Sequence, residues 1–385
     1  MNTRSTSTLG HVALMVAHCA GMVDLVALPV WVGTLIQHFK LDPQQAGGLA
    51  TLFLIGAVIS SVFLASRFQR VTGRWVAACG YALAAICFGL LSQPQEYAVM
   101  AALHACGGLA AGAALSVTHG TIARSANPHL KFAIVGVGLG IFAVLFLGVS
   151  PKVIAAAGGY MLFAIFGGVM LVAALVCAAA FPQPERMASA AGDAAVERIP
   201  RTVWFGILGI SAMALVQSMT FSFLERVGND RGFSLNAITG VLVVLGMVNL
   251  LPAALAAVLE KRWSARRVLL AGPVIQALLA AIIMNAPSFY AYAAAASVFA
   301  AVMIFTHTFA FGLMARLEPS GRAMAATPAM LMVGAAIGPV LGGTLVKTAG
   351  YGSLGLAALL IGSLAVLCMS RLPGHAPSSL AQEPA

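Results

Sequence analysis

The chain has 385 residues, of which 61% are hydrophobic and only 8% are charged, and its mean hydropathy is +0.97. Soluble domains carry about 25% charged and about 45–50% apolar residues. This composition excludes a soluble enzyme, a nucleic-acid-binding protein and a disordered scaffold, and it indicates a surface that faces lipid. The net charge of +10 arises from short basic clusters between apolar runs, which is typical of a membrane topology signal.

The apolar runs are long enough to cross a membrane, since a bilayer core about 30 Å thick requires about 20 residues of helix. The sequence therefore predicts an all-α integral membrane protein. In chain order, the 12 predicted transmembrane helices cover residues 10–37, 45–66, 73–92, 97–121, 132–151, 160–180, 203–224, 236–258, 268–286, 289–314, 324–346 and 351–370. The first run is too long for a signal-peptide core, and its flank Met1–Gly10 has no cleavage-like site, so we expect it to be retained. The six cysteines all fall inside spans and are interpreted as packing residues.

The basic residues are distributed unevenly between the predicted loops. With the N-terminus in the cytoplasm, the cytoplasmic segments hold 16 of them: Arg4, Arg67, Arg70, Arg74, Arg124, Lys131, Arg186, Arg198, Arg201, Lys261, Arg262, Arg266, Arg267, Arg316, Arg322 and Arg371. The opposite side holds 5: Lys40, Lys152, Arg226, Arg231 and Lys347. Because cytoplasmic loops are enriched in Lys and Arg, we predict a multi-pass protein of the cell membrane with both termini in the cytoplasm.

A polar stretch, Phe181–Thr202, interrupts the apolar pattern near the middle of the chain. It contains three prolines and six charged residues, which is typical of a linker. The predicted organisation is an N-terminal six-helix bundle over 1–180, a cytoplasmic linker over 181–202, a C-terminal six-helix bundle over 203–371 and a cytoplasmic tail over 372–385. Two halves of nearly equal length are typical of transporters built from internal repeats.

Two features recur in the same order in both halves. The loops after the second and eighth spans, Leu64–Trp75 and Ala257–Val268, are both basic. The fifth span is rich in glycine, and the eleventh contains Gly-Ala-Ala-Ile-Gly-Pro-Val-Leu-Gly-Gly over Gly334–Gly343. Glycines at four-residue spacing let helix backbones approach closely, so they are either packing residues or contacts at which helices rock. The prolines that lie within spans, and can kink them, are Pro29, Pro252, Pro273, Pro328 and Pro339.

These residues resemble the Major Facilitator Superfamily over nearly the whole chain. In the family's loop pattern, roughly Gly-x-Leu-Ala-Asp-Arg-x-Gly-Arg-Arg, the segments Leu64-Ala65 and Gly73-Arg74 fit, and Ser66 stands where the family has its acid. Gly338-Pro339 and Gly342-Gly343 match a family signature in the eleventh helix. The resemblance implies two pseudo-symmetric six-helix bundles that work by alternating access. It also implies conformational roles for Arg67, Gly73, Arg74, Gly108, Gly338, Pro339 and Gly342.

Asp24 is the one acidic residue near the centre of a predicted span. A carboxylate at this depth costs about 3 kcal/mol on insertion scales and usually faces a cavity or a partner. Burial favours its protonated form and a bound cation favours its charged form, so one carboxylate can couple a proton to a cationic substrate. The alternative interpretation is a structural acid that is hydrogen-bonded to a neighbouring helix.

His104 lies in the fourth span, and His104-x-x-x-Gly108 fits the family's Arg-x-x-x-Gly frame with a substitution. In this fold the first and fourth helices of a half line the central cavity, so the resemblance implies a proton relay between Asp24 and His104. A histidine changes charge near neutral pH, which an arginine does not. The alternative is a neutral histidine that is bonded to a backbone carbonyl.

The substrate cavity is predicted from residues that share helical faces near the span centres. They are Trp31 in the first span, Gln217 in the seventh, and Met303, His307 and Phe311 in the tenth. Surfaces rich in Met and aromatic residues adapt to varied amphipathic molecules. No Lys or Arg lies near a span centre, which argues against a dedicated anion carrier.

Some polar residues remain open in their interpretation. His18 and Asn249 lie within spans and are further candidates for the cavity, whereas His119 lies near the cytoplasmic end of its span. Glu225 and Arg226 close the seventh span, either as an external gate pair or as a wet helix end.

The sequence predicts a secondary active transporter rather than an enzyme. It has no catalytic cluster at span depth and no Gly-x-x-x-x-Gly-Lys-[Ser/Thr] loop for ATP. The predicted function is proton-coupled efflux of a small organic molecule, and the chain resembles the bacterial twelve-helix drug and sugar efflux branch of the family. The alternatives are a proton-coupled importer of a neutral or weakly acidic metabolite, and a receptor with the same fold. We expect a monomer whose partners are its substrate, protons and the lipid bilayer, with no nucleic acid, cofactor or metal.

Overall fold

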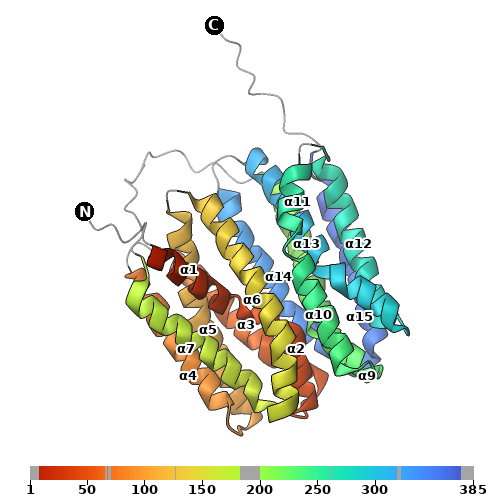
Figure 1. The fold of residues 1–385 in the computed structure, drawn as a ribbon. Coiled ribbons are helices and arrows are strands. Elements are labelled where there is room, and N and C mark those ends of the chain that lie inside the picture. Colours follow the sequence, from red (N-terminus) through yellow and green to blue (C-terminus); the bar gives the residue numbers. More distant parts are fainter. Residues whose placement is uncertain are drawn as a thin grey trace, which may run out of the picture.

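The computed structural model describes residues 8–65, 67, 71–125, 127–182, 200–260, 262–318 and 322–373. In this part of the chain there are 15 α-helices and no strand (Figure 1). Their bounds are α1 (Thr8–Gly21), α2 (Val23–Gln37), α3 (Pro43–Ala65), α4 (Gly73–Leu91), α5 (Tyr97–Ala123), α6 (Pro128–Ala157), α7 (Tyr160–Ala180), α8 (Arg201–Ser222), α9 (Leu224–Asp230), α10 (Leu235–Val248), α11 (Pro252–Leu259), α12 (Ala265–Asn285), α13 (Phe289–Leu317), α14 (Arg322–Ala349) and α15 (Tyr351–Ser370).

Within the described residues these helices provide 12 segments long and apolar enough to cross a membrane, which confirms the predicted fold class and the predicted spans. Three spans are built from two helices each. The first span contains α1 and α2, the seventh contains α8 and α9, and the eighth contains α10 and α11. The third break has a local cause, because Pro252 starts α11 and a proline has no N–H to donate to the preceding turn. Pro29 and Pro273 lie inside continuous helices.

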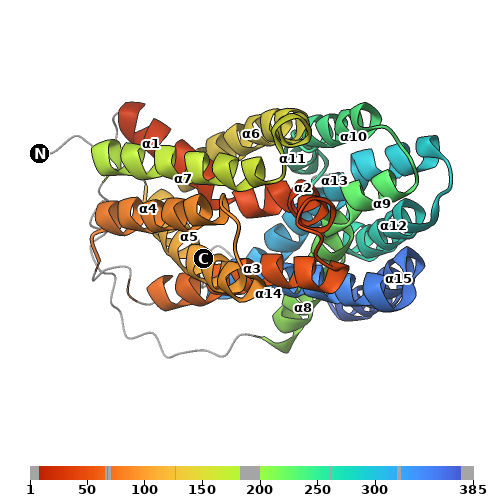
Figure 2. The ribbon, with the colours of Figure 1, turned by 90° about the horizontal axis from the view of Figure 1, so that it is seen from below.

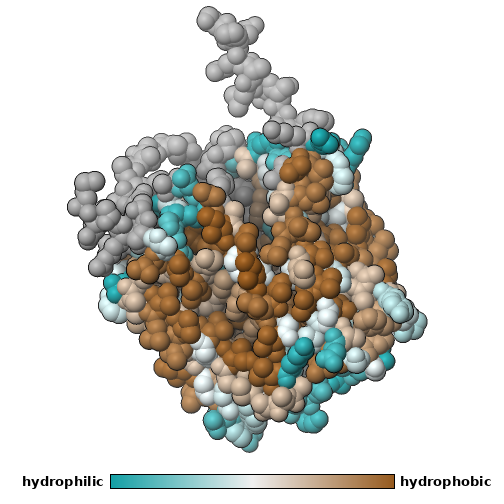
Figure 3. All heavy atoms as spheres, viewed as in Figure 1, coloured by the Kyte–Doolittle hydropathy of each residue, from teal (hydrophilic) through white to brown (hydrophobic). Residues whose placement is uncertain are grey.

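An even number of spans brings the start of α1 and the end of α15 to the same end of the molecule, which we call the terminal end; the opposite one is the distal end. Apolar side chains cover the sides of the molecule, and hydrophilic ones gather at the two ends (Figure 3). Exposed tryptophans lie at the terminal end and exposed tyrosines at the distal end: Trp75, Trp204 and Trp263, and Tyr97, Tyr160 and Tyr290. Such aromatic residues mark the two interfaces of a membrane.

The helices gather into two groups that lie side by side (Figure 2). We call α1–α7 the first bundle and α8–α15 the second bundle. The two bundles meet where α3 packs against α14 and α6 against α10, and α2 also contacts α8 and α9. Most of the predicted linker and tail, residues 183–199 and 374–385, lies outside the described residues, so the predicted domain boundaries stay a prediction.

Close backbone contacts join the two bundles in the distal half of the molecule. A Cβ atom on Gly47 of α3 would collide with the carbonyl oxygen of Pro339 in α14, and one on Gly343 would collide with the carbonyl oxygen of Pro43. One turn beyond Gly47, Oγ1 of Thr51 accepts the backbone N–H of Val340 at 3.1 Å. The distal end is therefore closed by α3 and α14 packed backbone against backbone.

An ion pair also joins the two bundles at the distal end, where Nζ of Lys347 lies 2.9 Å from Oδ2 of Asp42. Partial burial raises the pKa of Asp42, but hydrogen bonds from the Gln45 backbone and from Lys347 outweigh it, so the pKa lies below its usual value. A depressed pKa means that the pair stabilises closure above that pKa and is lost as the pH falls through it. The pair is thus intact throughout the neutral range.

We expect Lys347→Ala to open the distal end slightly. Both side chains are partly exposed, and such pairs contribute about 0.2–1 kcal/mol, so the ratio of closed to open molecules should fall by a factor of about 1.4–5. The measurement is the spin-label distance between Gln93→Cys and Tyr290→Cys, two exposed positions at the distal end of the two bundles, with the six native cysteines replaced. Lys152→Ala, at an exposed distal lysine, should leave this distance unchanged. An equal shift in both variants would contradict the assignment.

Gly108 has a packing role that differs from that of Gly47. Its Cβ would collide with the Phe53 carbonyl oxygen, where α5 crosses α3 inside the first bundle. At the neighbouring Gly107 the nearest atoms to a Cβ, from Cys87 and Phe53, are 3.5 Å away. We expect Gly108→Ala to lower the free energy of unfolding by about 1–3 kcal/mol, the usual cost of overpacking. Gly107→Ala is the control and should unfold like the wild type. Thermal melts in detergent compare the two variants, and a Gly108→Ala protein that melts like Gly107→Ala would refute this packing role.

Candidate functional site

The first span is interrupted in the middle of the membrane, at Met22. Gly21, the last residue of α1, is closely packed: a Cβ there would lie 2.8 Å from the Tyr81 hydroxyl and 2.6 Å from Leu115. The chain turns at Met22, with φ −106° and ψ 8°. The helical hydrogen bond that follows, from Val26 N–H to the Met22 carbonyl, is stretched to 3.4 Å. The break therefore creates a new helix start, that of α2, inside the membrane.

Asp24 lies in the first turn of α2, directly after this break. Its side chain is only 4% exposed, and its Oδ1 accepts the Leu25 backbone N–H at 2.8 Å. Free N–H groups and the helix dipole at a helix start favour a negative charge. Asp24 thus combines burial, which opposes the charged form, with a helix start that stabilises it, and such a balance suits a group that exchanges a proton.

Polar groups continue from Asp24 toward the terminal end. The Tyr81 hydroxyl, close enough to Asp24 for an electrostatic interaction, donates to the Ala17 carbonyl at 2.5 Å. Next to it, Nδ1 of His18 lies 3.0 Å from Nε2 of His119, so α1 and α5 share a histidine–histidine hydrogen bond. His119 also contacts the Phe132 ring at 5.7 Å. The first bundle therefore carries a column of polar groups on the terminal side of Asp24.

His104 and Trp31 come together, on the distal side of Asp24. Their rings stack at 5.6 Å between centroids, and both side chains are completely buried. Phe53, Phe88 and Phe166 surround Trp31. Nδ1 of His104 lies 2.6 Å from the Met100 carbonyl oxygen, which is the backbone bond of the alternative interpretation. Within the described part of the chain no hydrogen bond joins His104 to Asp24, so their relay stays a prediction.

The predicted cavity residues of the second bundle lie on α8 and α13. Oε1 of Gln217 accepts from Nε2 of Gln276 at 3.0 Å. Nδ1 of His307 lies 3.0 Å from the Met303 carbonyl oxygen, and its ring contacts Phe311 at 5.0 Å. Met303 is buried in an apolar cluster with residues of α8. Gln217, His307 and Phe311 are half-buried, and the contact of these four residues with substrate stays a prediction.

The predicted conformational residues lie at helix ends and at a helix crossing. Arg67 donates to the Phe63 carbonyl and covers its ring, and Arg74 donates to the Ala178 carbonyl of α7. Gly73 packs against Phe181. Gly338 and Gly342 pack against α8 within the second bundle, whereas the Pro339 carbonyl meets Gly47 of the first. Ser66 and Lys261 lie outside the described residues.

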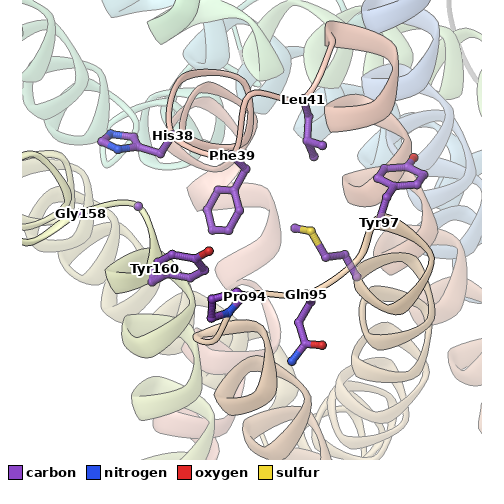
Figure 4. Close-up of a pocket in the computed structure, with 10 residues that line it drawn as sticks. His38, Phe39, Leu41, Pro94, Gln95, Tyr97, Gly158 and Tyr160 are labelled. Atoms are coloured by element: carbon purple, nitrogen blue, oxygen red, sulfur yellow. The ribbon is translucent and has the colours of Figure 1, made fainter.

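A pocket of about 410 Å³ opens at the distal end of the first bundle (Figure 4). Its lining residues are His38, Phe39, Leu41, Pro94, Gln95, Tyr97, Met100, Gly158, Gly159 and Tyr160. The rings of Phe39 and Tyr160 lie 4.9 Å apart in it. None of the predicted cavity residues lines this pocket, although Met100 connects it to His104 through the hydrogen bond described above.

Sequence reasoning missed Gln276 and Tyr81 as members of the site. Gln276 is 1% exposed and Tyr81 is fully buried. The criterion that selected Gln217, a polar side chain near a span centre, selects Gln276 as well. For Tyr81 and for the His18–His119 bond no such signal exists, because the contacts join residues 64 and 101 positions apart.

Comparison with known proteins was informative at the level of family and fold. The family profile described as Major Facilitator Superfamily matches residues 13–316, and no curated protein sequence matches the chain. Two similar solved structures are a D-xylose-proton symporter, with 15% identity and a TM-score of 0.75 over 94% of this chain and 97% of that chain, and the nucleoside transporter NupG, with 14% identity and a TM-score of 0.71 over 94% and 98%. A third is a bacterial homolog of the human lysosomal transporter Spinster in an inward-facing and occupied conformation, with 14% identity and a TM-score of 0.71 over 94% and 95%. Identities this low show a shared fold alone, but the family profile covers most of the chain. The chain is a transporter, not an enzyme, and it belongs to the Major Facilitator Superfamily.

Proposed function

We propose that this transporter couples the export of small organic molecules, above all amphipathic cations, to proton entry through Asp24. The observation that carries the proposal is the position of Asp24, a buried carboxyl at a helix start in the middle of the first span. Half-helix starts at the bilayer midplane are where transporters of this kind of architecture place their ion and substrate sites.

Coupling follows from competition at one carboxyl group. A proton and a substrate cation cannot both neutralise Asp24, so the arrival of one promotes release of the other. Alternating access then exchanges them across the membrane. In the second bundle the Gln217–Gln276 pair supplies neutral hydrogen-bonding groups, and Met303 and Phe311 supply adaptable apolar surface, which fits substrates of varied shape.

An importer is the alternative, and one observation favours it. A similar solved structure is that of a D-xylose-proton symporter, and a symporter loads the proton and the substrate together instead of alternately. With a neutral substrate, protonated Asp24 would support binding rather than compete with it. The two candidates therefore differ in the direction of transport relative to the proton gradient.

The test uses everted membrane vesicles with an acidic interior and a fluorescent pH indicator. The compounds added are ethidium and tetraphenylphosphonium as cations, and a panel of neutral sugars and nucleosides. We expect a cation to enter the vesicles and release protons from them. Uptake of a neutral compound by right-side-out vesicles together with protons would favour the importer. If no compound moves protons in either orientation, proton coupling is wrong. Glu96→Gln, which removes an exposed acid at the distal end, is the matched control and should behave as the wild type.

A further inference from the structure

The first span of the second bundle is interrupted in the same way as the first span of the first bundle. Its break falls at Phe223, with φ −109° and ψ 5°, between α8 and α9. Glu225 stands two residues after Phe223, as Asp24 stands two residues after Met22. Each bundle thus begins with a broken span that carries one acidic residue in the first turn after its break.

Glu225 is buried where the two bundles touch. Its side chain is 6% exposed, and a Cβ atom on Gly33 of α2 would lie 3.4 Å from its Oε2 and 3.8 Å from its Oε1. The Asn229 amide lies within hydrogen-bonding reach of the carboxyl. For Oε2, however, the described residues offer no hydrogen-bond partner. An ionised carboxylate with a buried and unpaired oxygen is costly, so this geometry suits a neutral carboxylic acid.

The cations near Glu225 are bound to other groups. Arg226, its neighbour in sequence, forms an ion pair with Asp230 at 2.7 Å instead of the gate pair with Glu225 that the sequence suggested. Arg231 donates to the carbonyl oxygens of Ile283 and Met284 at 2.8 and 2.5 Å. Lys347 forms the ion pair with Asp42 that is described above. Arg226 still interacts electrostatically with Glu225, but within the described residues no ion pair joins a cation to the Glu225 carboxyl.

The elements packed around α9 add few other titratable groups. On α2 the nearest acid is Asp24, which precedes the contact residue Gly33 by nine positions, or about 13 Å along a helix. Tyr292 of α13 donates to the Leu224 carbonyl at 2.9 Å and interacts electrostatically with Glu225. Helix α10 contains no titratable residue, and in α8 and α12 the titratable residues, Arg201, Arg266 and Arg267, stand in the first turn at the terminal end.

We propose that Glu225 is a second proton-binding site, which holds a proton while the distal end is closed and releases it to water when α9 separates from Gly33. In the release step the carboxyl O–H bond breaks, the electron pair stays on the oxygen, and the proton passes to water at the distal face. The charged carboxylate then opposes closure until a proton returns. This proposal rests on the proposed proton-coupled function, because it makes distal closure depend on proton uptake.

The test measures opening of the distal end without any substrate. It uses full-length protein in lipid nanodiscs with the spin-label pair at Gln93→Cys and Tyr290→Cys, from pH 5 to pH 9. For the wild type we expect the closed fraction to fall as the pH rises. Glu225→Gln, a permanent neutral form, should stay closed over the whole range, with a population change of less than about twofold. Glu225→Asp should keep a pH dependence, and Glu96→Gln, which removes an exposed acid at the distal end, should titrate as the wild type does.

A wild-type pH dependence in Glu225→Gln would overturn the proposal, and so would a pH-independent wild type. If Glu225→Gln does not fold, infrared difference spectra of the wild type and Glu225→Asp decide the question. A protonated-carboxyl band that is lost on opening and differs between the two proteins belongs to residue 225, whereas identical bands refute the proposal. Asp24→Asn in the same measurement separates the two proposals. If Asp24 does not bind the coupling proton, Asp24→Asn behaves as the wild type, and the pH dependence that Glu225 causes remains.

Discussion

Replacing Asp24 by Asn should abolish proton-driven accumulation of substrate. Asparagine has nearly the same shape and keeps an oxygen that can accept the Leu25 N–H, but it stays neutral at every pH. Proton and substrate then lose the shared group through which each affects the binding of the other. Coupling free energies between two ligands are typically about 1–3 kcal/mol, a factor of about 5–150, and this whole factor should be lost.

The measurement separates coupling from transport itself. Vesicles with and without a pH gradient are compared for the wild type, Asp24→Asn and Asp24→Glu, using a substrate found in the compound panel. Asp24→Asn should equilibrate the substrate between the two sides without accumulating it, and Asp24→Glu should recover part of the accumulation. Accumulation by Asp24→Asn at the wild-type level would show that the proton binds elsewhere.

The second large effect is expected from a single methyl group on α3. In Gly47→Ala the new Cβ meets the Pro339 carbonyl oxygen of the opposite bundle, and backbone atoms cannot move aside as a flexible side chain can. Overpacking of this kind costs about 1–3 kcal/mol, which lowers the ratio of closed to open molecules about 5- to 150-fold. Transport should fall as the closed fraction falls, because alternating access requires the distal end to close.

Gly48→Ala is the matched control, one residue further along the same helix. Its Cβ would lie at an ordinary 3.4 Å from the Tyr97 hydroxyl, inside the first bundle. We expect Gly48→Ala to transport and to close normally, whereas Gly47→Ala keeps its thermal stability but shows a long distal spin-label distance. Equal behaviour of the two variants would mean that the α3–α14 contact does not limit closure. Gly343→Ala, which meets Pro43 from the other side, should reproduce Gly47→Ala.

The spans could be predicted from the sequence because each is a nearly uninterrupted apolar run, and lipid imposes the helical form on any such run. The breaks in the first and seventh spans could not, since neither Met22 nor Phe223 is a helix breaker by composition. At the first break Gly21 packs against Tyr81 and Leu115, residues about 60 and 94 positions away in the chain, and no local pattern predicts such contacts. Pro252 gave a local signal, and α11 begins there.

One part of the candidate site could be predicted from the sequence and another part could not. Asp24 could be found because a single acid in an apolar run is conspicuous. Its location at a helix start, and the parallel location of Glu225, depend on the two breaks. The sequence placed Glu225 at a helix end beside Arg226, but Arg226 pairs with Asp230 one turn further on. Side chains one turn apart on a helix face each other, so the i to i+4 spacing favoured Asp230 over the adjacent acid.

Coupled transport is the central claim, and purified protein in liposomes tests it most directly. The vesicles contain equal substrate concentrations on both sides and receive only a pH gradient. The account predicts net movement of substrate away from equilibrium, toward the acidic compartment for a cation exporter, with proton movement in the opposite direction. Substrate that stays at equal concentration on both sides, while labelled substrate still exchanges, would show an uncoupled carrier and contradict the account.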